Sequence, residues 1–287
     1  MMGVSVEQPA APTRPPRILV IPGLDGATTL MAAAAPVLFQ GMRPLLFDHS
    51  LDRAEGGVEA LADRALRVLD QDEEGDSPAL VCGESFGGTV ALTLSRRHPD
   101  RVSGLILLSA FGWYPSLATW SGHLGLLLWR IVGNRIANCI LRASRPLGVP
   151  GALGFRFSRE IARVYVGQCH LDLAAYRAKC ELSLRFDARP WLGSITCPTF
   201  VLVGSWDPIV PTSAGRALAR SIPNARLYQL PGGHVVHAVR AVEAGQLIAA
   251  WFAETLEGHH YSPQGTRPAA LKRAARFAPV TAALSKS

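Results

Sequence analysis

One stretch, Ala79–Gly88, constrains the fold of this chain more than any other. It begins with the apolar run Ala79–Cys82, which is suited to a buried strand, and continues as Gly-Glu-Ser-Phe-Gly over residues 83–87. A helical pattern follows from Thr89 to Arg97, so Ser85 is predicted on a sharp turn between a strand and a helix. The flanking glycines leave room for strand and helix to pass close to such a strained turn. The context indicates that Ser85 is a nucleophile at the positive end of the following helix.

Apolar runs typical of strands alternate with helical patterns on both sides of this stretch. Further strands are predicted in the run 17–26, which ends in a Gly-bracketed turn, and at 44–48, 102–109, 199–204 and 226–230. Helices are predicted at 28–39, 57–69, 212–221 and 236–256. Strands that alternate with helices in this way pair in parallel and are covered on both faces. The sequence therefore predicts an α/β fold with a mostly parallel sheet of about six strands.

The alternation stops over residues 111–190, where no strand run occurs and the helical stretches 124–141 and 159–184 are found. This segment leaves the sheet after the fourth strand, at the carboxyl edge where ligands bind in open parallel sheets. We expect it to be a helical cap, or lid, over the site. The predicted organisation is a loose lead over 1–16, a core over 17–110 and 191–257, the cap at 111–190 and a basic tail at 258–287.

Two later strand ends supply residues that can activate Ser85. Asp207 lies three residues beyond the predicted strand 199–204, and His234 follows the last predicted strand. A serine hydroxyl is unreactive without a base, and that base must be oriented by a third group. The order Ser, Asp, His predicts a catalytic triad with His234 as general base and Asp207 as its partner. Two alternatives stay open: Asp207 caps the helix that follows it, or His237 takes the place of His234.

With these residues, the core segments 18–110 and 191–256 resemble the α/β-hydrolase superfamily, in particular its serine esterase, lipase and thioesterase-like members. The resemblance rests on Gly-x-Ser-x-Gly at the elbow, Gly-x-x-Asp-x-x-x-Pro around Asp207, Gly-Gly-His ending at His234, and Pro-Gly-Leu beginning at Pro22. The last motif departs from the family pattern, because His-Gly more usually precedes the key residue there.

The resemblance implies a mechanism as well as a fold. Ser85 would attack an acyl carbon, and the backbone N–H groups of Leu24 and Phe86 would hold the tetrahedral oxyanion. Water would then cleave the acyl-enzyme with the same base. Asp25 and Glu84 lie close to the site in sequence and are expected to orient turns, whereas His49 and His98 are expected to face solvent.

The cap is the segment expected to select the substrate. Four aromatic residues are candidates for a hydrophobic roof over an acyl chain: Trp113, Tyr114, Trp120 and Trp129. The stretch 124–142 has apolar residues on one side and arginines at helical spacing on the other, as in an amphipathic basic helix. Two interpretations stay open: the apolar side packs on the core, or the arginines make peripheral contact with anionic lipid or a charged head group.

Composition limits the other classes of function. The net charge of +7 is concentrated in residues 111–190, with eleven Lys and Arg against four acids, and in residues 258–287, with five against none. Nothing in the tail resembles a nucleic-acid-binding module. The five cysteines are scattered without a C-x-x-C pair, which indicates reduced thiols rather than a disulfide framework or a zinc site. We expect no metal and no cofactor.

The chain has no apolar run long enough for a membrane span, and residues 1–17 lack the apolar core of a signal peptide. A cytoplasmic protein is the expectation. The sequence thus predicts a serine hydrolase that acts on a small-molecule acyl ester or thioester with a fairly apolar acyl group. An acyltransferase that uses the same acyl-enzyme is the alternative, and a ligand-binding protein without turnover is a third. The sequence does not indicate the oligomeric state.

Overall fold

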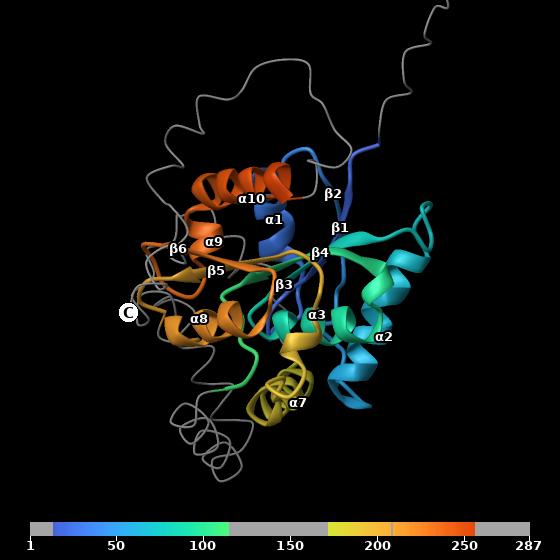
Figure 1. The fold of residues 1–287 in the computed structure, drawn as a ribbon. Coiled ribbons are helices and arrows are strands. Elements are labelled where there is room, and N and C mark those ends of the chain that lie inside the picture. The colour runs from blue at the N-terminus through green and yellow to red at the C-terminus, as the bar shows by residue number, and fades with distance from the viewer. Residues whose placement is uncertain (1–13, 115–171, 208, 256–287) are drawn as a thin grey trace, which may run out of the picture.

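The computed structural model describes residues 14–114, 172–207 and 209–255, and within them six strands form one parallel sheet (Figure 1). The strand order is β2-β1-β3-β4-β5-β6. The strands are β1 (Arg17–Ile21), β2 (Arg43–Leu46), β3 (Ala79–Glu84), β4 (Val102–Leu108), β5 (Thr199–Gly204) and β6 (Ala225–Leu230). The predicted α/β fold with a six-stranded parallel sheet is confirmed. Since all the strands run the same way, the carboxyl ends of β3, β5 and β6 meet at one edge of the sheet.

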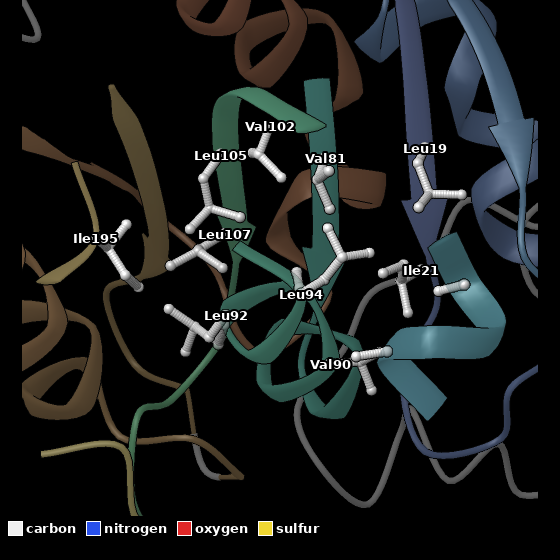
Figure 2. Close-up of a cluster of buried hydrophobic side chains, with 14 of the residues drawn as sticks. Leu19, Ile21, Val81, Val90, Leu92, Leu94, Val102, Leu105, Leu107 and Ile195 are labelled. Carbon is white, nitrogen blue, oxygen red and sulfur yellow. The ribbon is translucent and has the colours of Figure 1, made fainter. Parts of the chain in front are cut away.

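Helices cover both faces of the sheet, as Figure 1 shows. One face carries α1 (Thr29–Leu38), α9 (Val236–Val239) and α10 (Ala241–Thr255), and the other carries α2 (Gly57–Asp70), α3 (Phe86–Arg97) and α8 (Thr212–Ser221). Successive strand residues alternate between the two cores, because side chains of a strand point to opposite faces. Leu19 and Ile21 pack with α2 and α3 (Figure 2), whereas Ile18 and Val20 pack with α1 and α10. The central strands are therefore buried on both sides.

Two predicted helices differ from those observed. The helix after the elbow begins at Phe86, not at Thr89, because Gly87 and Gly88 continue directly into the helical turn. The predicted single helix 236–256 is two helices separated at Arg240, whose backbone leaves the helical region at φ −118° and ψ 46°. The Arg240 guanidinium donates to the carbonyl oxygen of Pro231 at 2.7 Å, which ties the break to the loop that carries His234.

Part of the predicted insertion is described. The helix α7 (Leu173–Arg185) occupies the end of the predicted helical stretch 159–184 and lies beside α3 (Figure 1). The two described ends of the insertion are paired, since Trp113 and Asp187 form an antiparallel bridge and the Ala188 N–H donates to the Gly112 carbonyl at 2.7 Å. The predicted basic helix over 124–142 and the tail 258–287 lie outside the described residues. No helix in the described ranges is long and apolar enough to cross a membrane.

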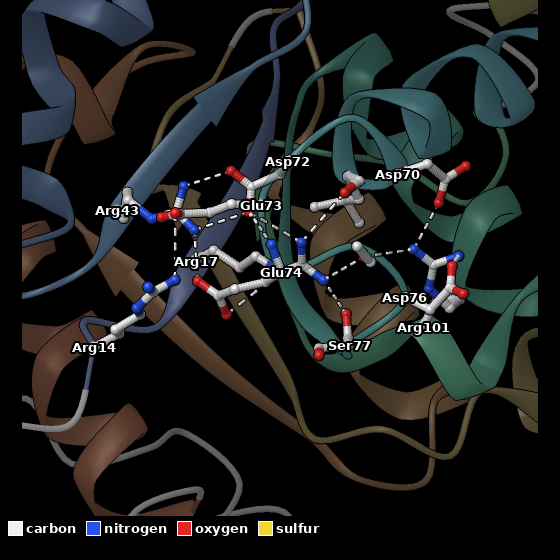
Figure 3. Close-up of polar contacts among 12 residues, drawn as sticks. Arg14, Arg17, Arg43, Asp70, Asp72, Glu73, Glu74, Asp76, Ser77 and Arg101 are labelled. Carbon is white, nitrogen blue, oxygen red and sulfur yellow. Dashed lines mark hydrogen bonds and ion pairs between the residues drawn. The ribbon is translucent and has the colours of Figure 1, made fainter. Parts of the chain in front are cut away.

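The amino edge of the sheet is held by a network of ion pairs (Figure 3). Arg17, which is 2% exposed at the start of β1, donates to Asp72 at 3.1 Å and to backbone carbonyls that include Leu69 and Gly75. Arg43, at the start of β2, donates to both oxygens of Asp72, at 2.5 and 2.8 Å. The bonds from Arg43 are the main cause that holds the pKa of Asp72 well below its usual value. We call this set of contacts the amino-edge network.

Candidate active site

Ser85 occupies a strained turn between β3 and α3. Its φ of 52° and ψ of −118° lie in a backbone region that residues other than glycine rarely adopt. The neighbouring glycines have no room for a side chain. A Cβ on Gly83 would lie 2.5 Å from the carbonyl oxygen of Gly87, and one on Gly87 would lie 2.2 Å from that of Ile21. The glycine spacing read from the sequence is thus a packing requirement of this turn.

Three segments far apart in the sequence bring Ser85, His234 and Asp207 together. His234 Nε2 lies 2.9 Å from Ser85 Oγ, and His234 Nδ1 lies 2.7 Å from Asp207 Oδ2. A carboxylate only accepts, so Nδ1 carries the proton and Nε2 is free to accept from the serine hydroxyl. The three residues are 5 to 8% exposed, so bulk water weakens these contacts little.

The loop after β5 aims Asp207 at the histidine. Asp207 Oδ1 accepts from the N–H groups of Ile209 and Val210 at 2.8 and 2.9 Å, which leaves Oδ2 for His234. The helix that follows is entered through Pro211 and has no side-chain cap. The helix-capping alternative for Asp207 therefore does not describe its contacts.

The loop after β6 holds His234 through a residue that the sequence analysis missed. Ser109, the residue after β4, donates its hydroxyl proton to the backbone carbonyl of His234 at 2.5 Å. Ser109 is buried and has a positive φ of 49°. The sequence offers only one signal for this contact, a polar residue directly after a very apolar strand.

Of the two candidate histidines, His234 is the one that reaches Ser85. His237 is fully buried in α9, and in the described structure neither of its ring nitrogens has a hydrogen-bond partner. Burial is the main cause that lowers the pKa of His237, to about 3, and the nearby His234 lowers it further. A neutral imidazole without a contact to Ser85 does not have the geometry of its general base.

The predicted oxyanion residues lie on two neighbouring turns. Residues 23–26 form a tight turn closed by the N–H of Gly26, which donates to the carbonyl of Gly23 at 3.0 Å. The Leu24 N–H takes no part in that closing bond. Phe86 is the first residue of α3, and the first four N–H groups of a helix have no acceptor within it. The two amides therefore remain the predicted donors to an oxyanion.

Glu84 connects the elbow to this turn. Its Oε2 accepts from the Gly23 N–H at 2.9 Å, so this buried carboxyl orients a turn, as predicted. Burial is the main cause that raises the pKa of Glu84, to about 7, although the nearby His234 opposes that rise. Burial likewise raises the pKa of Asp25, and the charge of Lys179 partly offsets the effect.

The prediction that His49 faces solvent is wrong. His49 is 1% exposed, and its Nε2 lies 3.1 Å from the carbonyl oxygen of Pro22. Burial, followed by the charge of Lys179, lowers its pKa to about 4. The sequence analysis missed this position because the partner, Lys179, comes from α7, 130 residues later. His98 is half-buried and lies 3.4 Å from Asp63.

Only two of the four predicted roof residues lie in described parts of the chain. Tyr114 donates to the carbonyl of Ile209 at 3.0 Å, next to the Asp207 loop, and its ring packs edge-on against Phe111. Burial raises the pKa of Tyr114 to about 12. Trp113 packs on the core beneath α3 and under the Arg189 guanidinium, at 5.5 Å from its ring centre. Trp120 and Trp129 lie outside the described residues.

Comparison with known proteins adds the family. A family model described as serine aminopeptidase, S33, matches residues 60–164. The chain is 30% identical over 227 residues to the pimeloyl-[acyl-carrier protein] methyl ester esterase of Aromatoleum aromaticum, an alignment that covers 74% of this chain and 88% of that protein. It is 27% identical over 268 residues to the polyketide synthase ThaQ of Burkholderia thailandensis, covering 85% of this chain but 12% of ThaQ.

Solved structures agree with the fold. The crystal structure of a hydrolase from Pseudomonas aeruginosa PA01 matches with a TM-score of 0.65 and 23% identity, covering 84% of this chain and 89% of that one. Sheet, elbow and sequence relatives lead to one conclusion. The chain belongs to the α/β-hydrolase superfamily and is an enzyme of the α/β-hydrolase fold.

Proposed function

We propose that this enzyme cleaves a carboxylic ester or thioester with a fairly apolar acyl group, by way of an acyl-enzyme on Ser85. The observation that carries the proposal is the continuous hydrogen-bonded path from Ser85 Oγ through His234 to Asp207, at 2.9 and 2.7 Å. The relative from Aromatoleum aromaticum, named as a methyl ester esterase, supports ester bonds as the substrate class.

The roles follow from which atoms carry protons. The Ser85 hydroxyl donates to Nε2, so that nitrogen takes the proton as Oγ attacks the acyl carbon. The imidazolium that forms is stabilised by the Asp207 carboxylate, which keeps Nδ1 protonated throughout. Nε2–H then protonates the leaving group, and water deprotonated by the same nitrogen releases the acid.

Charge on the substrate oxygen develops between the elbow and the turn at 23–26. The N–H groups of Leu24 and Phe86 are the donors we assign to that oxyanion, and α3 directs its positive end to the same place. Removing one donor of this kind typically costs about 3 to 4 kcal/mol of barrier. Because both donors are backbone groups, their position depends on how firmly the turn and the elbow are held.

Covalent labelling tests the proposal directly. A fluorophosphonate probe is expected to label Ser85 in the parent and to leave Ser85→Ala unlabelled. A panel of p-nitrophenyl esters and acyl thioesters of increasing chain length would then identify the acyl group. A folded parent that is not labelled and hydrolyses none of the panel contradicts the proposal. Products formed with a competing acceptor alcohol would reveal the alternative, acyl transfer.

A further inference from the structure

The side chain of His49 lies between the two segments that carry the assigned oxyanion donors. Its Nε2 donates to the carbonyl of Pro22 at 3.1 Å, and its backbone N–H donates to the carbonyl of Gly26 at 3.0 Å. We call residues 22–26 the oxyanion turn. The imidazole ring also lies 6.1 Å from the ring of Phe86, measured between centres. His49 thus contacts both ends of the oxyanion turn and the residue after the nucleophile.

Lys179 of α7 reaches His49 from the insertion. Its Nζ donates to the His49 carbonyl at 2.9 Å and lies 3.4 Å from His49 Nδ1. The Pro22 carbonyl can only accept, so His49 Nε2 carries the proton of the neutral ring. His49 Nδ1 is then left as an acceptor for the Lys179 ammonium. Lys179 therefore holds the backbone of His49 and favours the ring orientation and tautomer that the Pro22 carbonyl sets.

Packing alone does not account for a lysine at this place. Lys179 is fully buried, and burial lowers its pKa, because an ammonium loses its hydration there. The carboxylates of Asp25, Asp48 and Asp52 offset part of that loss. An apolar side chain of similar length would fill the space at a smaller cost. What the lysine adds is directed hydrogen bonding to His49.

His49 packs tightly against the oxyanion turn. Gly26 has a φ of +70°, and a Cβ there would lie 2.6 Å from the carbonyl carbon of His49 and 2.7 Å from its Nδ1. Any shift of His49 is therefore passed directly to the oxyanion turn, since close-packed groups move together.

We propose that Lys179 and His49 form a clamp through which α7 fixes the oxyanion turn, so that Lys179 is a positioning residue for the Leu24 N–H. The proposal rests on the proposed acyl-enzyme chemistry at Ser85. It links the position of α7 to catalysis, because the lysine belongs to α7 while the turn follows β1.

The kinetic test replaces Lys179 by methionine, which fills similar space without donating. We expect kcat for a p-nitrophenyl ester to fall about 10- to 100-fold with KM changed less than about two-fold. Displacing the Leu24 N–H by about 1 Å would weaken a hydrogen bond that forms only in the transition state and would leave substrate binding unchanged. The control is Leu182→Ala on the same helix, whose side chain packs against the core beneath α3. It is expected to lower the melting temperature and to leave kcat near the parent value.

His49→Leu gives a second route if Lys179→Met folds poorly. It should lower kcat by a similar factor, and the double variant should lose no more than the worse single variant, since both act through one contact. Losses that multiply in the double variant overturn the clamp. A folded Lys179→Met with parental kcat also overturns it, as does a Lys179→Met whose kcat is no lower than that of Leu182→Ala.

An NMR titration of His49, which does not depend on catalytic activity, separates this proposal from the proposed function. In the ¹⁵N-histidine spectrum of the parent, His49 should be the Nε2–H tautomer and should stay neutral to about pH 5, given its pKa of about 4. Lys179→Met should raise the pKa of His49, because the ammonium charge that lowers it is gone. An unchanged titration overturns the clamp, whether or not the parent hydrolyses esters. A parent that cannot be labelled at Ser85 overturns the proposed function instead.

Discussion

The amino edge of the sheet pairs its charges with opposite charges, whereas the carboxyl edge buries polar groups that titrate. At the amino edge, Arg17 and Arg43 converge on Asp72 and the pKa of that carboxyl is lowered. At the carboxyl edge, burial raises the pKa of Glu84 and lowers that of His49. The ion pairs of the amino edge thus stabilise the ionised form of Asp72, whereas burial at the carboxyl edge disfavours the ionised forms of Glu84 and His49.

Backbone strain follows the same division. The non-glycine residues with positive φ in the described ranges are Ala54, Ser85 and Ser109, and all three lie at the carboxyl edge. Strained conformations persist only where the surroundings hold them in place, and they gather at functional sites. The stabilising ion pairs thus lie at the edge without the candidate chemistry, and the strained backbone lies at the edge that holds the candidate triad.

The largest expected effect is on catalysis, from Asp207→Asn. Oδ1 already accepts from two backbone N–H groups, so the new amide nitrogen would take the place of Oδ2 and face His234. An NH₂ group cannot accept from Nδ1–H, so the imidazole would change tautomer and point Nε2–H at Ser85. We expect kcat to fall on the order of 10⁴-fold with little change in melting temperature. Parental kcat in steady-state assays would remove Asp207 from the triad.

The matching test at the amino edge is Arg17→Met, and it should act on stability alone. The change removes the Arg17 hydrogen bonds to the carbonyls of Leu69 and Gly75 and its ion pair with Asp72, which we expect to lower the free energy of unfolding by about 3 kcal/mol. Urea unfolding measures the loss. The control is Arg14→Met, which breaks the exposed pair with Glu73 and should cost less than about 1 kcal/mol. A drop in kcat at full folding would contradict the division between the edges.

The sheet and the candidate triad can be predicted from the sequence, and there is a physical reason why other contacts cannot. The alternation of apolar runs predicts the sheet, and the Gly-x-Ser-x-Gly turn predicts the place of Ser85, because local packing requires those residues. Asp207 and His234 can be predicted because each lies in the loop that follows a strand, and parallel strands end at one edge. These contacts depend on elements that leave periodic patterns in the sequence.

The second layer of contacts leaves no such pattern. Ser109 reaches His234 across 125 residues, and Lys179 reaches His49 across 130. Ser109 is a single polar residue among apolar neighbours, whereas Lys179 is one of several charged residues along α7. In both cases only the packing of distant elements gives the residue its partner. The break at Arg240 was missed for the same reason, since its guanidinium bonds to Pro231 in a loop. Propensity describes an element but not what lies beside it.

A third prediction concerns pH. The pKa of Glu84 is raised from an ordinary 4.5 to about 7, so the folded state binds this proton more tightly than the unfolded state. Stability from that proton is present below pH 4.5 and is lost as the pH rises to 7. Glu84→Gln keeps an acceptor for the Gly23 N–H without the charge, so its stability relative to the parent should rise by about 2 kcal/mol between pH 5 and pH 8.

Urea unfolding of both proteins at the two pH values measures that difference, because other titrating groups cancel between them. Glu59→Gln on the exposed face of α2 is the control and should show no such trend. A relative stability of Glu84→Gln that stays flat with pH would mean that the carboxyl is not destabilised by burial.

The smallest expected effect tests the strain itself. At a φ of 52°, any residue with a Cβ costs on the order of 1 to 3 kcal/mol, whereas glycine does not. After the extra entropy that glycine loses on folding, Ser85→Gly should be about 1 kcal/mol more stable than Ser85→Ala, and both should be inactive. The same pair at Ser95, buried within α3, should show the reverse order by about 1 kcal/mol, because that position is helical. Chemical unfolding of both pairs measures the sign of the difference between alanine and glycine. If alanine is the more stable at residue 85, as it is at residue 95, the backbone at Ser85 is not strained. The contrast in backbone strain between the two edges would then fail.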